Sequence, residues 1–166
     1  MTAAIALIAL VALQRIAELP YAARNTKRLL AQGGVESGRG HYPLFVLLHA
    51  AWLIAIALAL PKAPVIYWPF LLLYAVLEGL RLWVLWSLGP YWTTRIITVP
   101  GAPLVRRGPY RWLRHPNYWI VVGEIAVLPL VFGQIAVAVV FSLLNAGLLA
   151  WRIRIEERAL GPRRAR

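Results

Sequence analysis

Five long apolar runs, separated by short polar or proline-containing links, dominate this chain and predict membrane-spanning helices. They cover residues 2–23, 42–60, 65–88, 118–132 and 135–151. The first three have the roughly 17–25 residues that cross a hydrocarbon core about 30 Å thick. The fourth run spans only about 22 Å as a helix at 1.5 Å per residue. It therefore either ends below the far membrane surface or extends back into the preceding loop.

The last two runs are joined only by Gly133 and Gln134. A link this short requires the two helices to lie side by side and antiparallel. Prolines end the second run at Pro61 and Pro64, and Gly89-Pro90 ends the third, as expected for turns between spans. We therefore predict that helices four and five form a tight hairpin.

The composition is typical of an integral membrane protein, because 61% of the 166 residues are hydrophobic and the mean hydropathy is +0.67. The chain has no cysteine and no aspartate, and its three histidines are far apart in sequence. We therefore expect no metal site. We predict one transmembrane domain, in which residues 1–98 supply three helices with their loops. Residues 99–166 supply a ligand-binding loop, the helical hairpin and a tail.

The formal net charge of +12 is concentrated beside the apolar runs, so membrane topology explains it better than nucleic-acid binding does. Residues 24–40 predict a loop at the aqueous surface, residues 91–116 an ordered but irregular segment, and residues 152–166 a basic tail. The opposite side has only Lys62. By the positive-inside rule we predict an all-α membrane protein with five transmembrane helices, N-terminus out and C-terminus in.

The segment from Gly108 to Tyr118 stands out between the apolar runs, because it combines arginines, aromatic residues and His115 within a proline-bounded loop. Groups of this kind bind a charged, flat, nucleotide-like molecule. Because the segment belongs to the basic side of the protein, we expect the site to face the cytoplasm and to draw on cytosolic cofactors.

The hairpin predicts which residues of the tail face this loop. Counting outward from the turn at 1.5 Å per residue places Arg152 level with His115, and Glu156 level with Arg111. Arg152 and Glu156 are four residues apart and therefore share one helix face. Either they form an internal ion pair that caps the helix, or they present a cation and a carboxylate to a ligand.

The same counting places Asn145 near Glu124 at membrane depth, where a hydrogen bond between them is expected. For Glu124 we leave open a second role, contact with a cofactor amine. Two further pairs have the three-residue spacing that lets side chains meet on one helix face. They are Arg15 with Glu18, and Glu78 with Arg81.

We expect two roles for His49 and the aromatic residues of the front half, namely substrate contact and anchoring at the membrane interface. We expect His49 and Trp52 of the second run to point into the bundle and contact substrate, with His49 not acting as a general base. Four aromatics at the end of the third run are expected to anchor the protein at the membrane interface. They are Trp83, Trp86, Tyr91 and Trp92.

Two motifs give the chain a family resemblance. Arg-His-Pro-Asn-Tyr at residues 114–118, preceded by Gly-Pro-Tyr at 108–110 and followed by Arg-x-Arg-x-Glu-Glu at 152–157, resembles the isoprenylcysteine carboxyl methyltransferase family of membrane enzymes. The resemblance is strongest over residues 99–160. Features of residues 24–43 are similar to a small bacterial branch that is associated with type III polyketide synthases and O-methylates alkylpyrones and related phenolic lipids.

The resemblance implies S-adenosylmethionine as methyl donor in a bacterial cytoplasmic membrane, bound without a Rossmann domain. The sequence accordingly has no G-x-G-x-x-G motif. It further implies Arg152 as the substrate contact and, with His115, as the catalytic pair. The implied cofactor contacts are Tyr110, Arg111, Trp112, Leu113, His115, Tyr118, Gly123, Glu124 and Glu156.

Methyl transfer from a sulfonium needs mainly alignment, so a strong base is not mandatory. The absence of an obvious catalytic dyad in the sequence favours an acidic acceptor such as a hydroxypyrone; a resorcinol would need a nearby His or Glu. Prenylcysteine-type members continue past Glu-Glu with an aromatic-rich segment, whereas this chain ends Gly-Pro-Arg-Arg-Ala-Arg. This departure argues against prenylcysteine substrates.

We therefore predict O-methylation of a long-chain alkylpyrone or alkylresorcinol-type lipid, functionally coupled to a type III polyketide synthase. The alternatives within the same cofactor class are carboxyl methylation of isoprenylcysteine and phospholipid N-methylation. A reductase that binds NADPH is a third alternative, because membrane sterol reductases have a similar terminal hairpin. A non-enzymatic membrane scaffold, in which the ion pairs are structural, is a fourth.

Overall fold

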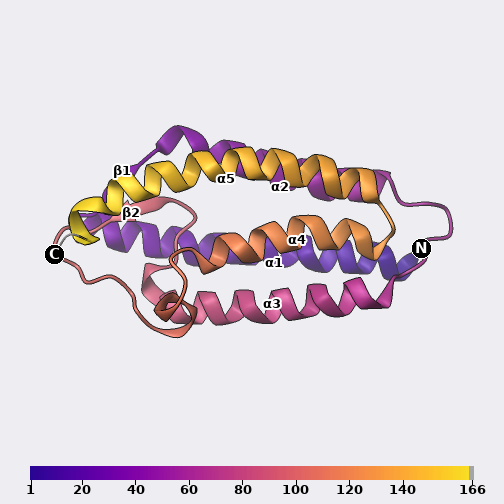
Figure 1. The fold of residues 1–166 in the computed structure, drawn as a ribbon, viewed down its shortest axis with the longest axis horizontal. Coiled ribbons are helices and arrows are strands. Elements are labelled where there is room, and N and C mark those ends of the chain that lie inside the picture. Colours follow the sequence, from indigo (N-terminus) through magenta and orange to yellow (C-terminus); the bar gives the residue numbers. More distant parts are fainter. Residues whose placement is uncertain (165–166) are drawn as a thin grey trace.

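Five antiparallel helices form an elongated bundle in the computed structural model, which describes residues 1–164, with side chains to residue 161 (Figure 1). The helices are α1 (Thr2–Ala31), α2 (Tyr42–Leu58), α3 (Trp68–Leu88), α4 (Pro116–Val131) and α5 (Ile135–Arg164). Three short 3-10 turns, η1 (Arg39–His41), η2 (Gly89–Tyr91) and η3 (Gly108–Arg111), and two strands, β1 (Val35–Ser37) and β2 (Ile96–Thr98), complete the described elements.

Four of the described helices are long and apolar enough to cross a bilayer, so the chain is an integral membrane protein. They are the helices that contain α1, α2, α3 and α5. The fourth apolar helix, α4, has 16 residues and measures about 24 Å. It begins only two residues before the predicted run. At its other end Phe132 and Gln134 are buried, and Gln134 Nε2 donates to the carbonyl of Ile56, 3.0 Å away.

Two helices are longer than predicted. Residues 24–31 continue α1 and are not a loop, because Asn25 and Leu29 extend its buried face at helical spacing. The Asn25 amide donates to the carbonyls of Gly89 and Trp92, at 3.2 and 2.9 Å, which ties this end of α1 to η2. The predicted basic tail is likewise helical and continues α5. Its last residues, Ala165 and Arg166, lie outside the described residues.

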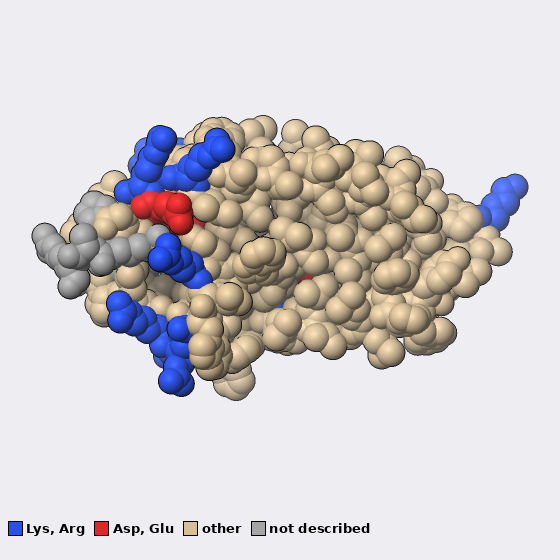
Figure 2. Space-filling view, in the orientation of Figure 1, with Lys and Arg blue, Asp and Glu red and all other residues tan. Residues whose placement is uncertain are grey.

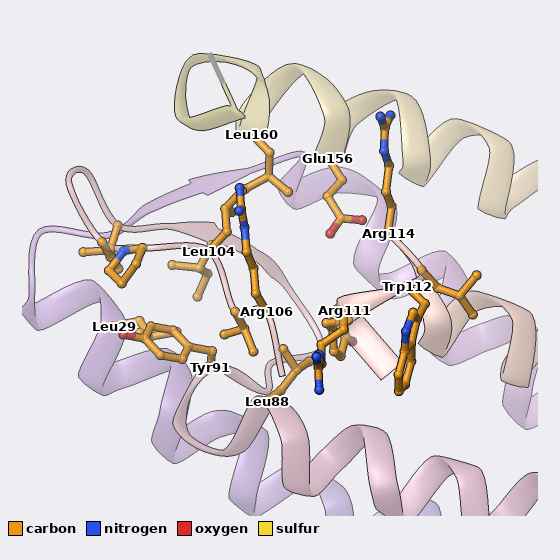
Figure 3. A pocket seen from close by; sticks show the side chains of 17 residues that line it. Leu29, Leu88, Tyr91, Leu104, Arg106, Arg111, Trp112, Arg114, Glu156 and Leu160 are labelled. Atoms are coloured by element: carbon orange, nitrogen blue, oxygen red, sulfur yellow. The ribbon is translucent and has the colours of Figure 1, made fainter. Parts of the chain in front are cut away.

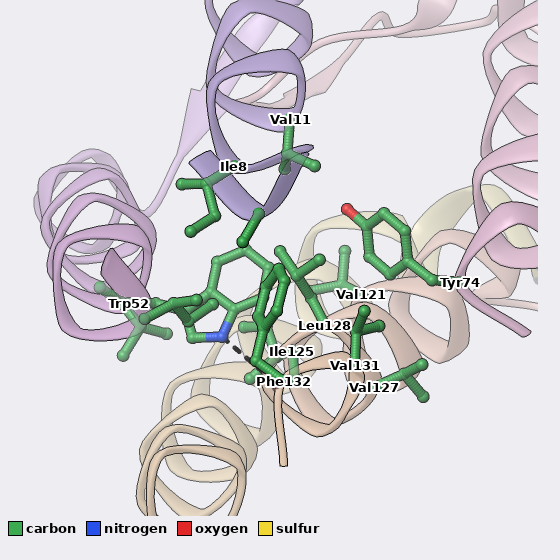
Figure 4. Packing of buried hydrophobic residues seen from close by; sticks show 13 residues of the cluster. Ile8, Val11, Trp52, Tyr74, Val121, Ile125, Val127, Leu128, Val131 and Phe132 are labelled. Atoms are coloured by element: carbon green, nitrogen blue, oxygen red, sulfur yellow. Dashed lines mark hydrogen bonds between the residues drawn. The ribbon is translucent and has the colours of Figure 1, made fainter. Parts of the chain in front are cut away.

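The main hydrophobic core lies between α1, α2, α3 and α4 (Figure 4). Ile8 and Val11 of α1 face Ile125 and Leu128 of α4 across the indole of Trp52. Trp52 is completely buried, and its Nε1 donates to the carbonyl of Ile125 over 3.2 Å. The structure therefore places Trp52 in the core, where it holds α2 against α4.

Helices α3 and α4 approach each other closely at Gly123. A Cβ atom added there would lie 2.9 Å from Cδ2 of Leu77 on α3. A larger residue must therefore displace Leu77 or separate the two helices.

We expect Gly123→Leu to lower the unfolding free energy by about 1–3 kcal/mol, as measured by thermal unfolding in detergent micelles. Gly147→Leu on α5 is the matched control, because no atom lies within 4 Å of its added Cβ. Equal stability of the two variants would contradict close packing at Gly123.

Five ionisable side chains form a network at mid-depth between three helices, where unpaired charges are expensive. Arg81 of α3 contacts Glu18 of α1 at 2.9 Å and Glu124 of α4 at 3.0 Å. Arg15 of α1 contacts Glu124 at 3.0 Å and Glu78 of α3 at 3.3 Å. The predicted pair of Arg15 and Glu18 is present at 3.7 Å. The predicted pairing of Glu78 with Arg81 is wrong, since both residues bond to α1 instead.

Asn145 does not form the predicted hydrogen bond with Glu124. Its side chain is buried, and its Oδ1 has no hydrogen-bond partner among the described residues. Glu124 is held instead by the two arginines of the network. Counting from the hairpin turn places residues at the same level, but it does not show which face of α4 they occupy.

A two-stranded antiparallel sheet, absent from the all-α prediction, closes the basic end of the bundle. Strand β1 pairs with β2, with Glu36 opposite Ile97. Arg95 reaches the Glu36 carboxylate at 3.2 Å across the sheet. This sheet holds the loop after α1 against the long segment between α3 and α4.

Charged side chains gather at the end of the molecule that carries this sheet (Figure 2). Exposed large hydrophobic residues occur along the long helices between the two ends. Lys62 lies in the link between α2 and α3, at the other end of the bundle (Figure 1). This distribution matches a protein whose middle is surrounded by lipid tails. The charged side chains at the surface are therefore concentrated at one end.

Candidate active site

Four polar side chains of α4 and α5 meet at the basic end of the bundle. His115 precedes α4 and Tyr118 lies in its first turn, where Pro116 starts the helix without needing a backbone donor. Arg152 and Glu156 come from facing turns of α5, which runs beside α4 (Figure 1). Only three residues separate the two helices, so the local sequence alone brings these four groups together.

The hydroxyl of Tyr118 is the centre of this group. It donates to Glu156 Oε2 at 2.5 Å and accepts from Arg152 Nε at 2.9 Å. Arg152 and Glu156 are therefore linked through the Tyr118 hydroxyl, and they form no direct ion pair with each other. The simple interpretation of an i,i+4 ion pair that caps the helix is wrong.

His115 lies against both Tyr118 and Glu156. Its ring stacks on Tyr118 with centroids 5.2 Å apart, and its Nδ1 is 3.3 Å from Glu156 Oε2. The Nε2 atom is buried without a hydrogen-bond partner, 3.8 Å from Glu157 Oε1. A carboxylate beside Nδ1 favours the tautomer that leaves the Nε2 lone pair free. The structure thus contains a histidine–carboxylate dyad that the sequence did not reveal.

Arg152 is anchored by residues from the front half of the chain. Its Nη1 lies 3.1 Å from Nε2 of His41 in η1, and its Nη2 donates to the carbonyl of Thr94 at 3.1 Å. The guanidinium lies over the rings of Phe45 and Tyr118, at 5.4 and 5.8 Å. Its partners are neutral, so among the described residues no carboxylate forms an ion pair with it.

The level predicted from the hairpin is correct to within about one helical turn. Arg152 bonds to Tyr118, one turn further along α4 than the predicted His115. Glu156 bonds to His115 and Tyr118 rather than to Arg111. Two causes explain these offsets. Arg152 and Tyr118 both lie within helices, and the long arginine side chain leans toward the N-terminus of α5, which is the direction of Tyr118. Arg111 lies in η3 and not in α4, so counting at 1.5 Å per residue does not apply to it.

The loop before α4 is fixed by its contact with α3. Gly108 has φ +57°, and a Cβ there would lie 2.0 Å from Ser87 Oγ, so only glycine fits. Arg107 Nε donates to the carbonyl of Ser87 at 2.6 Å. These contacts aim Tyr110 at α5, where burial and the Glu156 carboxylate raise the pKa of the Tyr110 phenol. Tyr110 therefore remains a protonated hydrogen-bond donor at neutral pH.

Two adjoining cavities open between η3, β2 and α5. The outer compartment, about 430 Å³, is lined by residues that include Tyr110, Arg111, Trp112 and Leu113 (Figure 3). Figure 3 shows Glu156 pointing into it from α5. The inner compartment, about 150 Å³, is lined by His115, Tyr118 and Arg152 among others. Seven residues line both compartments, so the two spaces adjoin, and Glu156 is the carboxylate among the seven.

The structure brings eight of the predicted site residues to these compartments and leaves four elsewhere. Gly123 lies in the α3–α4 contact, Glu124 in the buried ion network and Trp52 in the core. The ring of His49 bonds through Nδ1 to the carbonyl of Phe45, one turn earlier on its own helix. None of these four lines either compartment.

Several residues of the inner region were not predicted as site residues, and three of them are Trp92, Asn117 and His41. Trp92 is buried and lines the inner compartment, although its position in the sequence suggested a membrane anchor. Asn117 lines the same space, within the Arg-His-Pro-Asn-Tyr motif. His41 reaches Arg152 from a distant part of the chain. Only Asn117 had a local sequence signal, because the sheet that brings the other two close depends on long-range pairing.

Unpartnered polar atoms show that the inner region suits a polar ligand. Trp92 Nε1, His115 Nε2 and Asn117 Oδ1 are buried without a hydrogen-bond partner among the described residues. A buried polar atom without a hydrogen bond costs free energy, unless a ligand or a water molecule supplies the missing partner. Together the compartments offer a carboxylate, several guanidinium groups and aromatic faces. This set fits an organic molecule that carries both charges and a flat ring.

Comparison with known proteins defines the class. The profile of the isoprenylcysteine carboxyl methyltransferase (ICMT) family matches residues 70–162, which contain most of α3, all of α4, the site motifs and most of α5. The chain therefore belongs to this family of membrane proteins. Family membership indicates a methyltransferase, and such enzymes generally use S-adenosylmethionine.

Two curated relatives resemble nearly the whole chain. An uncharacterized protein of Bacillus subtilis, YpbQ, is 42% identical over 160 residues, which cover 93% of this chain and 94% of the relative. An uncharacterized protein of Haemophilus influenzae is 26% identical over 153 residues, which cover 88% of each chain. No solved structure matches.

Proposed function

We propose that this protein transfers a methyl group from S-adenosylmethionine to an oxygen of a lipophilic acceptor, a long-chain alkylpyrone or alkylresorcinol-type polyketide lipid. The observation that carries the proposal is the position of Arg152. Its guanidinium borders the inner compartment, hydrogen-bonds only to neutral groups among the described residues, and shares the Tyr118 hydroxyl with Glu156, which lines both compartments. An acceptor oxygen with negative charge suits this position.

The outer compartment fits the methyl donor. Its volume, about 430 Å³, lies within the range of about 300–1,000 Å³ usual for small-molecule sites. Glu156 would hold a cationic group of the donor, and Arg111 and Arg114 would hold its carboxylate. Tyr110 and Trp112 offer rings for the adenine. When bound, S-adenosylmethionine supplies the methyl carbon: the new C–O bond forms as the C–S bond breaks, and that electron pair stays on sulfur.

The inner compartment orients the acceptor. Arg152 would pair with the acceptor oxygen and hold it near Glu156, which lines both compartments, so that the oxygen and the methyl carbon are aligned. A hydroxypyrone arrives largely ionised and needs no base. For a resorcinol hydroxyl, the free Nε2 of His115 would take the proton, with Glu156 stabilising the charged imidazole through Nδ1. His115 and Arg152 are thus the proposed catalytic residues.

The location of the site supports a membrane-embedded acceptor. Both compartments lie at the basic end of the bundle, which we propose faces the cytoplasm of a bacterial cell. The acceptor's hydrocarbon chain would remain in the bilayer while its polar ring reaches Arg152. A type III polyketide synthase, whose products are amphipathic rings with long tails, is the proposed source of the acceptor.

We expect the purified protein, with S-adenosylmethionine, to methylate a long-chain alkylpyrone in detergent micelles, with the product detected by mass spectrometry. A farnesylcysteine analogue and phosphatidylethanolamine serve as the competing acceptors. Turnover only on one of these two would refute the proposed acceptor while retaining the methyltransferase.

The class of cofactor is tested separately, by calorimetric titration with S-adenosylhomocysteine and with NADPH. We expect binding of S-adenosylhomocysteine. Binding of NADPH alone would assign a reductase instead, and binding of neither would favour a non-enzymatic membrane protein.

A further inference from the structure

We propose that His41 is a positioning residue: it holds the Arg152 guanidinium in the orientation that binds the acceptor, and thereby sets acceptor affinity. This inference rests on the proposed function, because the acceptor site is the one assigned above. Its basis is the contact between His41 Nε2 and Arg152 Nη1, at 3.1 Å, which joins the front half of the chain to α5.

All three nitrogens of Arg152 are already engaged, and each by a different element. Nε donates to the Tyr118 hydroxyl on α4, Nη1 to His41 in η1, and Nη2 to the carbonyl of Thr94 just before β2. The two terminal nitrogens each carry a second hydrogen. Those two hydrogens remain for a ligand, and their direction is set by the partners that occupy the first two.

The contact with Arg152 fixes the protonation state of His41. Arginine is only a donor, so His41 Nε2 must accept, and the imidazole is neutral with its proton on Nδ1. A neutral partner orients the guanidinium without cancelling its charge. A carboxylate at the same place would neutralise Arg152 and weaken its attraction for an anionic acceptor.

The imidazole itself is held rigidly. His41 is 1% exposed and packs edge-on against Phe45 and Trp151, with centroids 6.0 and 5.9 Å away. Gly38 has φ +67°, and a Cβ there would lie 2.6 Å from His41 Nδ1, so the backbone approaches the ring as only glycine allows. The ring therefore cannot follow a displaced guanidinium.

His41→Leu and His41→Gln separate positioning from packing. Leucine fills space but accepts no hydrogen bond, whereas the glutamine Oε1 takes the place of the Nε2 acceptor. We expect His41→Leu to weaken binding of a long-chain alkylpyrone about tenfold, as one charge-assisted hydrogen bond is lost. Affinity for S-adenosylhomocysteine should stay within about twofold, and His41→Gln should recover most of the pyrone affinity. Both ligands are measured by calorimetric titration of the full chain in detergent micelles.

Each outcome of these titrations decides a separate point. Unchanged pyrone affinity in His41→Leu overturns the inference. A parallel loss of both affinities, or no recovery in His41→Gln, also overturns it, because either result indicates a structural role. Pyrone binding by the wild-type protein without methyl transfer refutes the proposed function but leaves the role of His41 standing. Absence of pyrone binding by the wild-type protein refutes both.

Discussion

Glu156→Gln is expected to weaken binding of S-adenosylhomocysteine by about 10- to 150-fold, which corresponds to the loss of a hydrogen bond to a charged group, about 1.5–3 kcal/mol. Glu156 is the carboxylate that borders both compartments, and it accepts from the Tyr118 hydroxyl at 2.5 Å. Glutamine keeps the size of the side chain but lacks the negative charge that would pair with the ammonium group of S-adenosylhomocysteine. Calorimetric titration in detergent micelles measures the change.

Glu157→Gln is the matched control for this prediction. Glu157 is the next residue of the same helix, its side chain is 46% exposed, and its contact with His115 is longer, 3.8 Å. We expect the control to bind within about threefold of the wild-type protein, because exposed charge pairs contribute little. Equal affinities of the two variants would remove Glu156 from the cofactor site and favour a purely structural group.

Arg81→Met is expected to lower the unfolding free energy by about 3–5 kcal/mol, the usual effect of removing one partner from a buried ion pair. Arg81 is 5% exposed and contacts Glu18 of α1 and Glu124 of α4. Methionine fills similar space but removes the closer of the two cations that contact Glu18, and the remaining one, Arg15, is 3.7 Å away. Thermal or denaturant unfolding in detergent micelles provides the measurement.

Arg154→Met is the control variant, because it removes the same charge from an exposed position near the end of α5. Its effect should be within about 0.5 kcal/mol, as for other surface changes. If Arg81→Met unfolds at the same temperature as Arg154→Met, the network does not hold α1 against α3 and α4.

The sequence predicted the helices well, because their driving force is local. Long apolar runs bounded by Gly and Pro need no knowledge of distant residues, and the ends of α2 and α3 fall within three residues of expectation. The extension of α1 was missed because its exposed face is polar, and its helical state depends on a few buried contacts, such as Asn25 with the carbonyl of Trp92. The extension of α5 was already assumed as far as Glu156, where helical counting placed Arg152 and Glu156 on one face.

The part of the site that α4 and α5 form was predictable, because these helices are adjacent in sequence. The part formed by segments distant in sequence was not. Arg152 and Glu156 face the start of α4 because three residues join the helices. The partners His41 and Thr94 reach Arg152 because β1 and β2 pair although they are far apart in sequence, with Ser37 opposite Ile96 and Val35 opposite Thr98. The predicted pair of Glu78 with Arg81 was wrong for the same reason, since spacing within one helix cannot show that three helices share the charges.

The single hydroxyl of Tyr118 has a thermodynamic consequence. It has one proton to donate and gives it to Glu156, while its lone pair accepts from Arg152. A ligand that hydrogen-bonds to Glu156 in place of Tyr118 changes the strength of the hydrogen bond between the Tyr118 oxygen and Arg152. A ligand that binds Arg152 likewise changes the hydrogen bond from Tyr118 to Glu156. Because such coupling is reciprocal, the two halves of the site cannot be filled independently, and each ligand sets the affinity of the other by the same factor.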